Sequence, residues 1–137
     1  MNGRPELKTG EVYGIDVACF QGQVNWFQVA GDGVSFAYIK ATQGTTYVNP
    51  FFSTDWKEAK AYGAYQFFSL CSSGLAQAQP FLAAVPRDPA ALPPAVDLGL
   101  KGICNLRPSA SAVAANGRFR DSDPTFDGEG GGPLCRT

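Results

Sequence analysis

The sequence predicts an α/β fold in which a parallel sheet is wrapped by helices. Short runs rich in β-branched and aromatic residues alternate with helical patterns, in the order β-α-β-α-β-α-β. Such crossovers are almost always right-handed, which favours an open sheet or a barrel surrounded by helices. The length of 137 residues, with 45% hydrophobic side chains and a net charge of −1, is typical of one globular domain.

Four segments have the composition of strands. Residues 11–17 form the first, 34–41 the second and clearest, and 62–68 the third. The fourth, Ala95-Val96, follows two prolines and ends at Asp97. Residues 42–46 are expected to turn away from the second strand.

Three helices are expected between these strands. Asn25 is a good N-cap for a short helix that Gly31 ends. Asn49-Pro50 predicts the start of a second helix that ends near Ala61. Its apolar face would carry Phe52, Trp56 and Ala59, and both tryptophans of the chain, Trp26 and Trp56, are expected in the core.

The third helix is expected to open at Ser72-Ser73-Gly74 and to contain a proline. Its predicted apolar face consists of Leu75, Ala78, Leu82 and Val85. Pro80 interrupts this pattern and should kink or delay the helix.

The composition divides the chain into three parts. Residues 1–10 form a loose lead-in, 11–115 the domain, and 116–137 a glycine-rich tail without apolar periodicity. A short Ala-rich helix is expected to end near Ala115. The tail is interpreted as disordered or frame-shifted.

The residue counts exclude several kinds of chemistry and partner. There is no histidine, which excludes histidine bases, triads and metal ligands, and no C-x-x-C pair, which argues against a zinc site. The balanced charge argues against nucleic acid as a partner. No segment resembles a signal peptide or a membrane span, so export would need another route.

Two carboxylates close predicted strands and are the first candidates for function. Asp16 lies one residue before the end of the first strand, and Asp97 lies at the end of the fourth. In barrels of alternating strands and helices, that end of a strand carries the chemistry. A pair of strand-borne acids suits glycoside hydrolysis, although either aspartate could simply open a loop.

Four blocks of sequence carry a resemblance to a known family. They are Gly14-Ile15-Asp16-Val17 with Gln21-Gly22 and Asn25-Trp26, then 36–44, 63–67 and 92–98. In this order and spacing they resemble glycoside hydrolase family 25, the muramidase-type lysozymes. The resemblance implies a modified (β/α) barrel, of which this chain would supply a partial TIM-like barrel of the first four βα units. It also implies hydrolysis of the β-1,4 bond between N-acetylmuramic acid and N-acetylglucosamine in peptidoglycan, without metal or cofactor.

The resemblance also assigns site residues. Asp16 matches the family's first-strand active-site Asp, and Asp97 matches the first acid of its Asp-x-Glu pair. The positions that line or border the cleft are Phe20, Tyr38, Lys40 and Tyr65. Lys40 could instead pair with a strand-end Asp, and the tyrosines could simply fill the barrel.

Three matched positions depart from the family pattern. Gly99 stands where the family has its general acid, a Glu, so the chain lacks the usual proton donor. Gln43 stands where Glu is usual and Gln66 where His is usual. Asp97 is a poor substitute acid because its placement differs by two residues from the lost group. We therefore expect a lysozyme of impaired activity, a non-catalytic glycan-binding protein, or an inactive gene fragment.

Two further expectations concern assembly and redox state. Cys71 and Cys104 each follow a predicted strand and would lie at the same end of the sheet, so a disulfide between them is expected, whereas Cys19 and Cys135 have no obvious partners. Such a bond would fit export to the cell wall. Half a barrel also leaves sheet edges open, which predicts either self-association or a loosely packed molecule.

Overall fold

The computed structural model describes residues 6–59, 61–69 and 72–98. Its elements are β1 (Gly14–Val17), the 3-10 helix η1 (Cys19–Gln21), α1 (Trp26–Gly31), β2 (Phe36–Gln43), β3 (Tyr47–Val48), α2 (Phe52–Glu58), β4 (Tyr62–Phe67), α3 (Gly74–Ala84) and β5 (Ala95–Asp97). The predictions for the 109–115 helix, the tail, Gly99 and the Cys71–Cys104 pair lie outside these residues.

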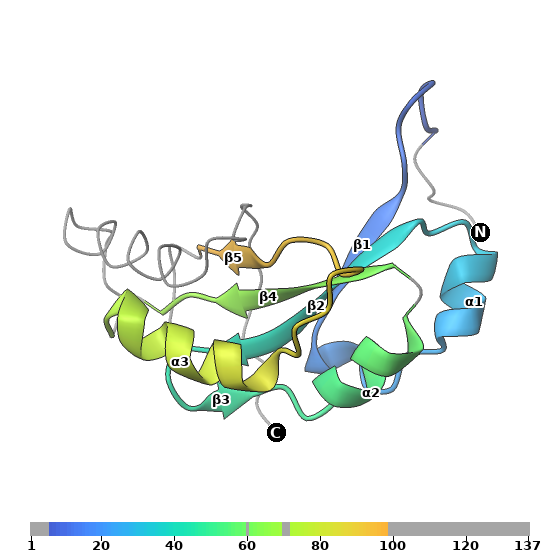
Figure 1. The fold of residues 1–137 in the computed structure, drawn as a ribbon. Coiled ribbons are helices and arrows are strands. Elements are labelled where there is room, and N and C mark those ends of the chain that lie inside the picture. The colour runs from blue at the N-terminus through green and yellow to red at the C-terminus, as the bar shows by residue number, and fades with distance from the viewer. Residues whose placement is uncertain (1–5, 60, 70–71, 99–137) are drawn as a thin grey trace.

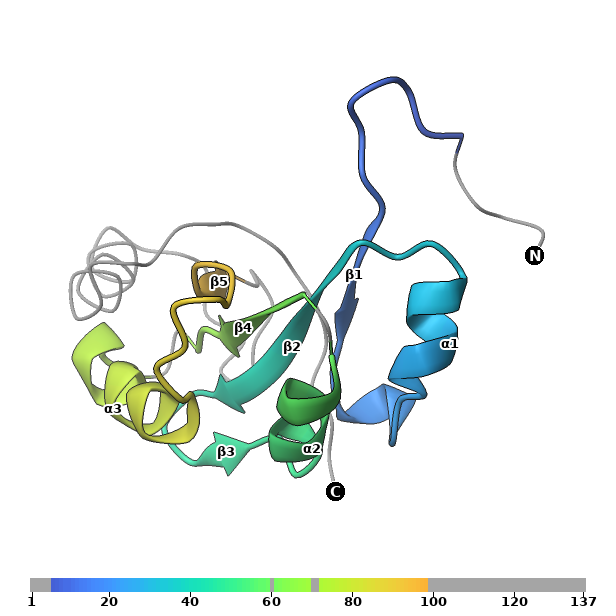
Figure 2. The same ribbon diagram turned by 45° about the vertical axis from the view of Figure 1, so that its right-hand side comes forward.

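The described strands form one sheet in the order β1-β2-β4-β5, with β3 attached to β2. The four main strands pair in parallel, as the alternation of strands and helices predicted. The three helices form an arc around one side of the sheet (Figures 1 and 2). The α/β fold with a parallel sheet is therefore confirmed.

One strand was not expected from the sequence. β2 continues to Gln43, beyond its predicted end, and β3 returns antiparallel to it. Gly44 makes the reversal with a φ of 54°, a conformation that glycine adopts readily. Residues 42–46 thus form the end of a strand and a tight turn rather than a departure from the sheet.

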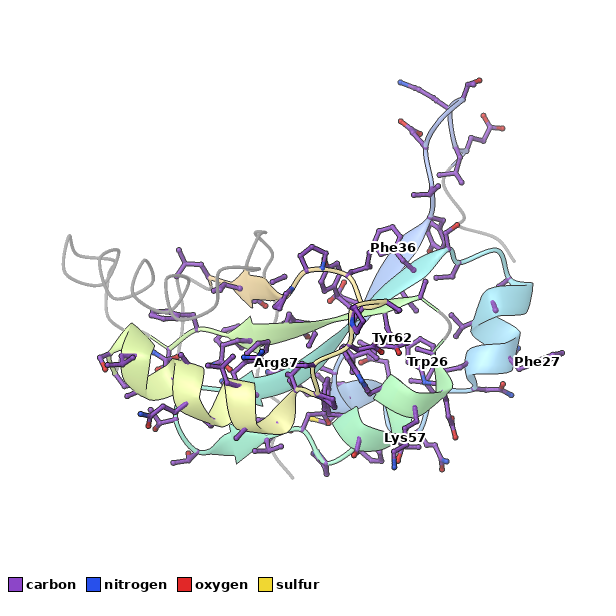
Figure 3. The ribbon with its side chains drawn as sticks, in the orientation of Figure 1. Trp26, Phe27, Phe36, Lys57, Tyr62 and Arg87 are labelled. Atoms are coloured by element: carbon purple, nitrogen blue, oxygen red, sulfur yellow. The ribbon has the colours of Figure 1, made fainter. Side chains whose placement is uncertain are left out.

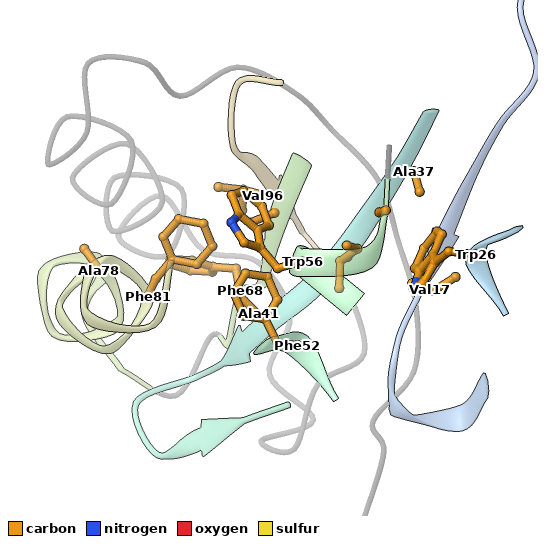
Figure 4. Packing of buried hydrophobic residues seen from close by; sticks show 13 residues of the cluster. Val17, Trp26, Ala37, Ala41, Phe52, Trp56, Phe68, Ala78, Phe81 and Val96 are labelled. Atoms are coloured by element: carbon orange, nitrogen blue, oxygen red, sulfur yellow. The ribbon is translucent and has the colours of Figure 1, made fainter. Parts of the chain in front are cut away.

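The hydrophobic core lies between the helices and one face of the sheet (Figure 4). Alternate residues of a strand point to opposite faces, so each strand contributes every second side chain. The buried strand residues in the core are Val17, Ala37, Ile39, Ala41, Ala64 and Val96, and the helices add Trp26, Phe52, Trp56, Ala78 and Phe81. The predicted core positions of both tryptophans are confirmed.

The first helix begins as expected, whereas α2 begins at Phe52, two residues after the start predicted from Asn49-Pro50, with Phe51 as its N-cap. The Asn25 side chain accepts a hydrogen bond from the backbone N–H of Gln28, which confirms the N-cap. The indole N–H of Trp26 donates to Asp55 Oδ1 over 2.9 Å, and this buried bond ties α1 to α2. α2 ends at Glu58, slightly before its predicted end, with Phe52 and Trp56 buried.

The predicted apolar face of α3 is confirmed for Ala78, which is buried, and for Val85, which packs against the core, and is wrong for the two leucines. Leu75 and Leu82 are 57% and 46% exposed, whereas the buried residues of the helix include Gln77 and Phe81. The physical reason is the Gln77 side chain, which accepts from the Ser69 N–H at 2.8 Å and donates to the Ser69 carbonyl at 2.8 Å. These bonds pair the backbone N–H and C=O of Ser69, in the segment before the helix. They hold the Gln77 side chain, rather than those of the leucines, toward the interior.

Pro80 does not delay this helix, which begins at Gly74 and contains the proline. Ser73 is its N-cap and accepts from the Ala76 N–H. Of the helices in the described part of the chain, none has both the length and the apolarity needed to cross a membrane.

Candidate functional site

The face of the sheet opposite the core collects the polar residues that the sequence singled out. Figure 3 shows Phe36 on this side of the strands and Trp26 on the other. Residues paired across parallel strands share a face. Three rows therefore cross this face: Asp16–Tyr38–Gly63, then Lys40–Tyr65–Ala95, then Gln43–Phe67–Asp97. We call this set the polar face.

A β-bulge in β2 brings Gln43 onto the polar face. Strict alternation would put Lys40 and Gln43 on opposite faces, because they are three residues apart. The pairing with β4 shifts between Lys40 and Thr42, which leaves Ala41 as an extra residue. A bulge re-aims the side chains that follow it. The Lys40 ammonium consequently donates a hydrogen bond to Gln43 Oε1.

Lys40 is the central cation of the polar face. It is 1% exposed, and its Nζ lies 4.9 Å from the ring centre of Phe67 and 5.7 Å from that of Tyr47. Burial lowers the pKa of Lys40 to about 8, while the nearby Asp97 carboxylate opposes this shift. This interaction supports the pairing of Lys40 with a strand-end aspartate, which stays a prediction.

Tyr65 lies within the electrostatic reach of both candidate carboxylates. Burial is the main cause that raises its pKa, and the charges of Asp16 and Asp97 raise it further. Asp16 is exposed, whereas Asp97 is 4% exposed. Asp16 on β1 and Asp97 on β5, three positions apart in the strand order, thus both raise the pKa of the buried Tyr65 phenol. The strand register puts both aspartates on the same face of the sheet.

Tyr38 lies in the first row of the polar face, and Phe20 lies in the 3-10 helix that follows β1. The Tyr38 hydroxyl donates to the carbonyl of Pro93 over 2.9 Å, which joins β2 to the segment that enters β5. Its ring lies over Gly63, where an added Cβ would come within 2.5 Å of it. Phe20 belongs to η1, directly after β1, and is 56% exposed.

Gln66 lies apart from the other candidates. It points to the core side of the sheet, where its Oε1 accepts a hydrogen bond from the Thr42 hydroxyl. Its Nε2 donates to the carbonyls of Gly44 and Phe67 at 3.2 and 3.1 Å and lies 3.4 Å from Gln77 Oε1 of α3. These contacts make Gln66 part of a buried amide network beneath α3.

The sequence reasoning missed two features of the site. Phe67 and Tyr47 flank the Lys40 ammonium, and for Phe67 the alternation along β4 with Tyr65 was an available signal. Cys19, for which no partner was apparent, is disulfide-bonded, and its sulfur accepts from the Tyr47 hydroxyl at 3.0 Å. In the described part of the chain, no cluster of three or more His, Cys, Asp or Glu could hold a metal ion.

Comparison with known proteins identifies the family. The sequence model of glycosyl hydrolases family 25 matches residues 15–121. The chain belongs to this family. Over 78 residues it is 47% identical to lysozyme M1 of Streptomyces globisporus, a match that covers 53% of this chain and 26% of that protein. It is also 36% identical over 80 residues to the N,O-diacetylmuramidase of Chalaropsis sp, covering 53% of this chain and 38% of the relative.

Solved structures of the family have the same fold. A family 25 glycosyl hydrolase from Bacillus anthracis superposes with a TM-score of 0.73 at 30% identity, covering 86% of this chain and 59% of that one. The bacterial lysozyme from Streptomyces coelicolor superposes with a TM-score of 0.70 at 35% identity, covering 83% of this chain and 58% of that one. This family 25 chain therefore spans less than two thirds of each of these relatives and structures.

Proposed function

We propose that this family 25 chain binds the glycan strands of peptidoglycan on its polar face and slowly hydrolyses their β-1,4 bonds. The observation that carries the proposal is that the strand register puts Asp16 of β1 and Asp97 of β5 on the same face of the sheet, with Lys40 and Tyr65 on the row between them. Lysozymes and muramidases among the relatives support the substrate class. The site of action would be the cell wall, outside the cytoplasm.

The two aspartates would stabilise the positive charge that develops on the sugar ring. Glycosidases pass through an oxocarbenium-like transition state, which a carboxylate stabilises or attacks. The Lys40 ammonium and the Asp97 carboxylate attract each other, which would hold Asp97 in place for this role.

Slow turnover follows from the residue at position 99. Gly99 stands two residues after Asp97 and has no proton to give to the leaving oxygen. General acid catalysis typically contributes about 10²–10⁴-fold, so hydrolysis would be slower by that order. This same observation favours a second candidate function, the binding of glycan without hydrolysis.

The parallel sheet would be the first four βα units of a barrel. β1 and β5 each pair with one neighbour among the described strands, as the ends of an incomplete barrel would. The alignment to 58–59% of the solved relatives is consistent with a partial barrel. Association of two chains through these edges would cover them.

Release of muropeptides from purified cell walls tests the proposal. The chain should release them slowly, Asp97→Asn should abolish release, and Gly99→Glu should raise it. A chain that co-sediments with walls but releases nothing, even as Gly99→Glu, would favour the binding function. Equal release by the wild type and Asp97→Asn would contradict the catalytic assignment.

A further inference from the structure

A hollow on the helical side of the molecule is separate from the polar face. Its volume is about 580 Å³, within the range of roughly 300–1,000 Å³ that is typical of small-molecule sites. It lies at the start of α1 and the end of α2, and its lining residues are Gln23, Val24, Asn25, Trp26, Phe27 and Glu58. Trp26 also belongs to the core between the helices and the sheet, so the sheet lies between this hollow and the polar face. We call it the α1 hollow.

Phe27 gives the α1 hollow an exposed aromatic wall. Its side chain is 87% exposed and projects outward from α1, whereas the neighbouring Trp26 is turned toward the core (Figure 3). One face of a pyranose ring carries C–H groups, and these suit the negative π face of an aromatic ring. A ring that is open to solvent beside a hollow therefore provides a platform on which a sugar can stack.

The polar side chains of the α1 hollow offer both donors and acceptors to a ligand. Asn25 Oδ1 accepts from the Gln28 N–H at 3.1 Å, which fixes the orientation of the amide and leaves Nδ2 to donate. The Gln23 amide can donate and accept, and the Glu58 carboxylate accepts. All three residues are exposed, and within the described part of the chain these groups make no hydrogen bond. They are consequently available to a molecule that enters the hollow.

These groups favour hydroxyls over charged ligands. The Glu58 carboxylate, the only charged side chain of the lining, would repel a carboxylate or a phosphate. An ammonium group has donors only, so it could not accept from Asn25 Nδ2. A sugar hydroxyl both donates and accepts, and it can therefore pair with Asn25 as well as with Glu58.

We propose that the α1 hollow is a second glycan-binding site, in which a pyranose ring stacks on Phe27 and its hydroxyls pair with the polar lining residues. The choice of a β-1,4-linked glycan rests on the proposed function, whereas the site itself does not depend on the polar face. Because the sheet lies between the two, one chain can hold a strand in the α1 hollow while the polar face acts on another. The hollow would thus retain a slow enzyme on the wall.

Titration of the ¹⁵N-labelled full chain with tetra-N-acetylchitotetraose measures each site by its own backbone amides. Those of residues 23–27 should shift, and Phe27→Ala should weaken the affinity that they report about tenfold, as expected for the loss of one stacked ring. Phe27→Tyr, which keeps an aromatic ring, should retain the wild-type affinity. Leu75→Ala, at an exposed apolar residue of α3, should also leave it unchanged. Amides of the polar face should respond alike in the wild type and in all three variants.

The same titration shows which outcome contradicts the inference. Unmoved amides at residues 23–27, or an affinity there that Phe27→Ala leaves unchanged, would overturn it. Shifts at these amides with an N-acetylated lysine amide and none with the sugar would assign the hollow to an ammonium group, which also overturns it. Wall hydrolysis that depends on Asp97 would still stand in those cases. Conversely, shifts at residues 23–27 without any at the polar face would support the second site and contradict the proposed function, so the two failures are distinguishable.

Discussion

The buried Lys40 ammonium should make the stability of the fold rise as the pH rises above neutrality. Burial lowers its pKa from 10.5 to about 8 in the folded protein. Between these two values the unfolded chain holds the proton and the folded protein releases it. The free energy of unfolding therefore increases with pH, because the unfolded state binds more protons.

The size of the effect follows from the two pKa values. Each pH unit within the window adds at most about 1.4 kcal/mol, and integration from about pH 7.5 to 9.5 gives about 2 kcal/mol. The window closes near pH 10, where tyrosines of the unfolded chain begin to ionise. Burial raises the pKa of Tyr65 in the folded state, so ionisation there favours unfolding.

Urea unfolding at a series of pH values measures the rise. Lys40→Met and Lys40→Arg should both lack it, since neither side chain titrates in this range, and Lys40→Arg keeps the positive charge if Lys40→Met folds poorly. Lys57→Met, at an exposed lysine of α2, should retain it. A flat profile in the wild type, or the same rise in both Lys40 variants, would refute the reasoning.

Three further predictions test the packing and the sheet edges. Gly14→Ala should lower the free energy of unfolding by about 1–3 kcal/mol, because the new Cβ would lie 2.2 Å from the ring of Phe36; unchanged urea midpoints would contradict this. Gln77→Ala should cost about 3 kcal/mol by removing the two hydrogen bonds that its side chain makes to the Ser69 backbone, whereas exposed Gln79→Ala should cost less than about 0.5 kcal/mol. Light scattering should find dimers or larger species that dissociate on dilution; a monomer at all concentrations would argue against association through the edges of β1 and β5.

The main frame of the fold was predictable from local pattern. β2 and α2 were found because β-branched and aromatic residues, or apolar residues at helical spacing, mark them directly. The Asn25 N-cap was found for the same reason, since its hydrogen bond is local. Elements whose structure depends on residues close together in the chain could therefore be predicted from the sequence.

The features that were missed depend on contacts between distant segments. The inward face of α3 is set by Gln77 binding the backbone at Ser69, which outweighs the leucines of the periodic pattern. The bulge after Lys40 follows from pairing with β4, and it decides which side of the sheet Gln43 faces. Neither contact can be predicted from the spacing of apolar residues along the sequence.

The candidate site was predicted in part for the same reasons. Alternation along each strand suffices to put Asp16, Lys40 and Asp97 on one face once the register is known. Gln66 matched a family position but faces the helices, because it follows Tyr65 directly and so points the other way. Residue type alone could not tell which of the matched family positions lie on the polar face and which face the helices.

The rate at which new reducing ends appear in purified peptidoglycan is the most direct test of the central claim. The account predicts slow release by the wild type, and its loss when either Asp16 or Asp97 is replaced by asparagine while the urea midpoint is maintained. Release that persists in both folded variants would contradict the claim that these two carboxylates act on a glycan together.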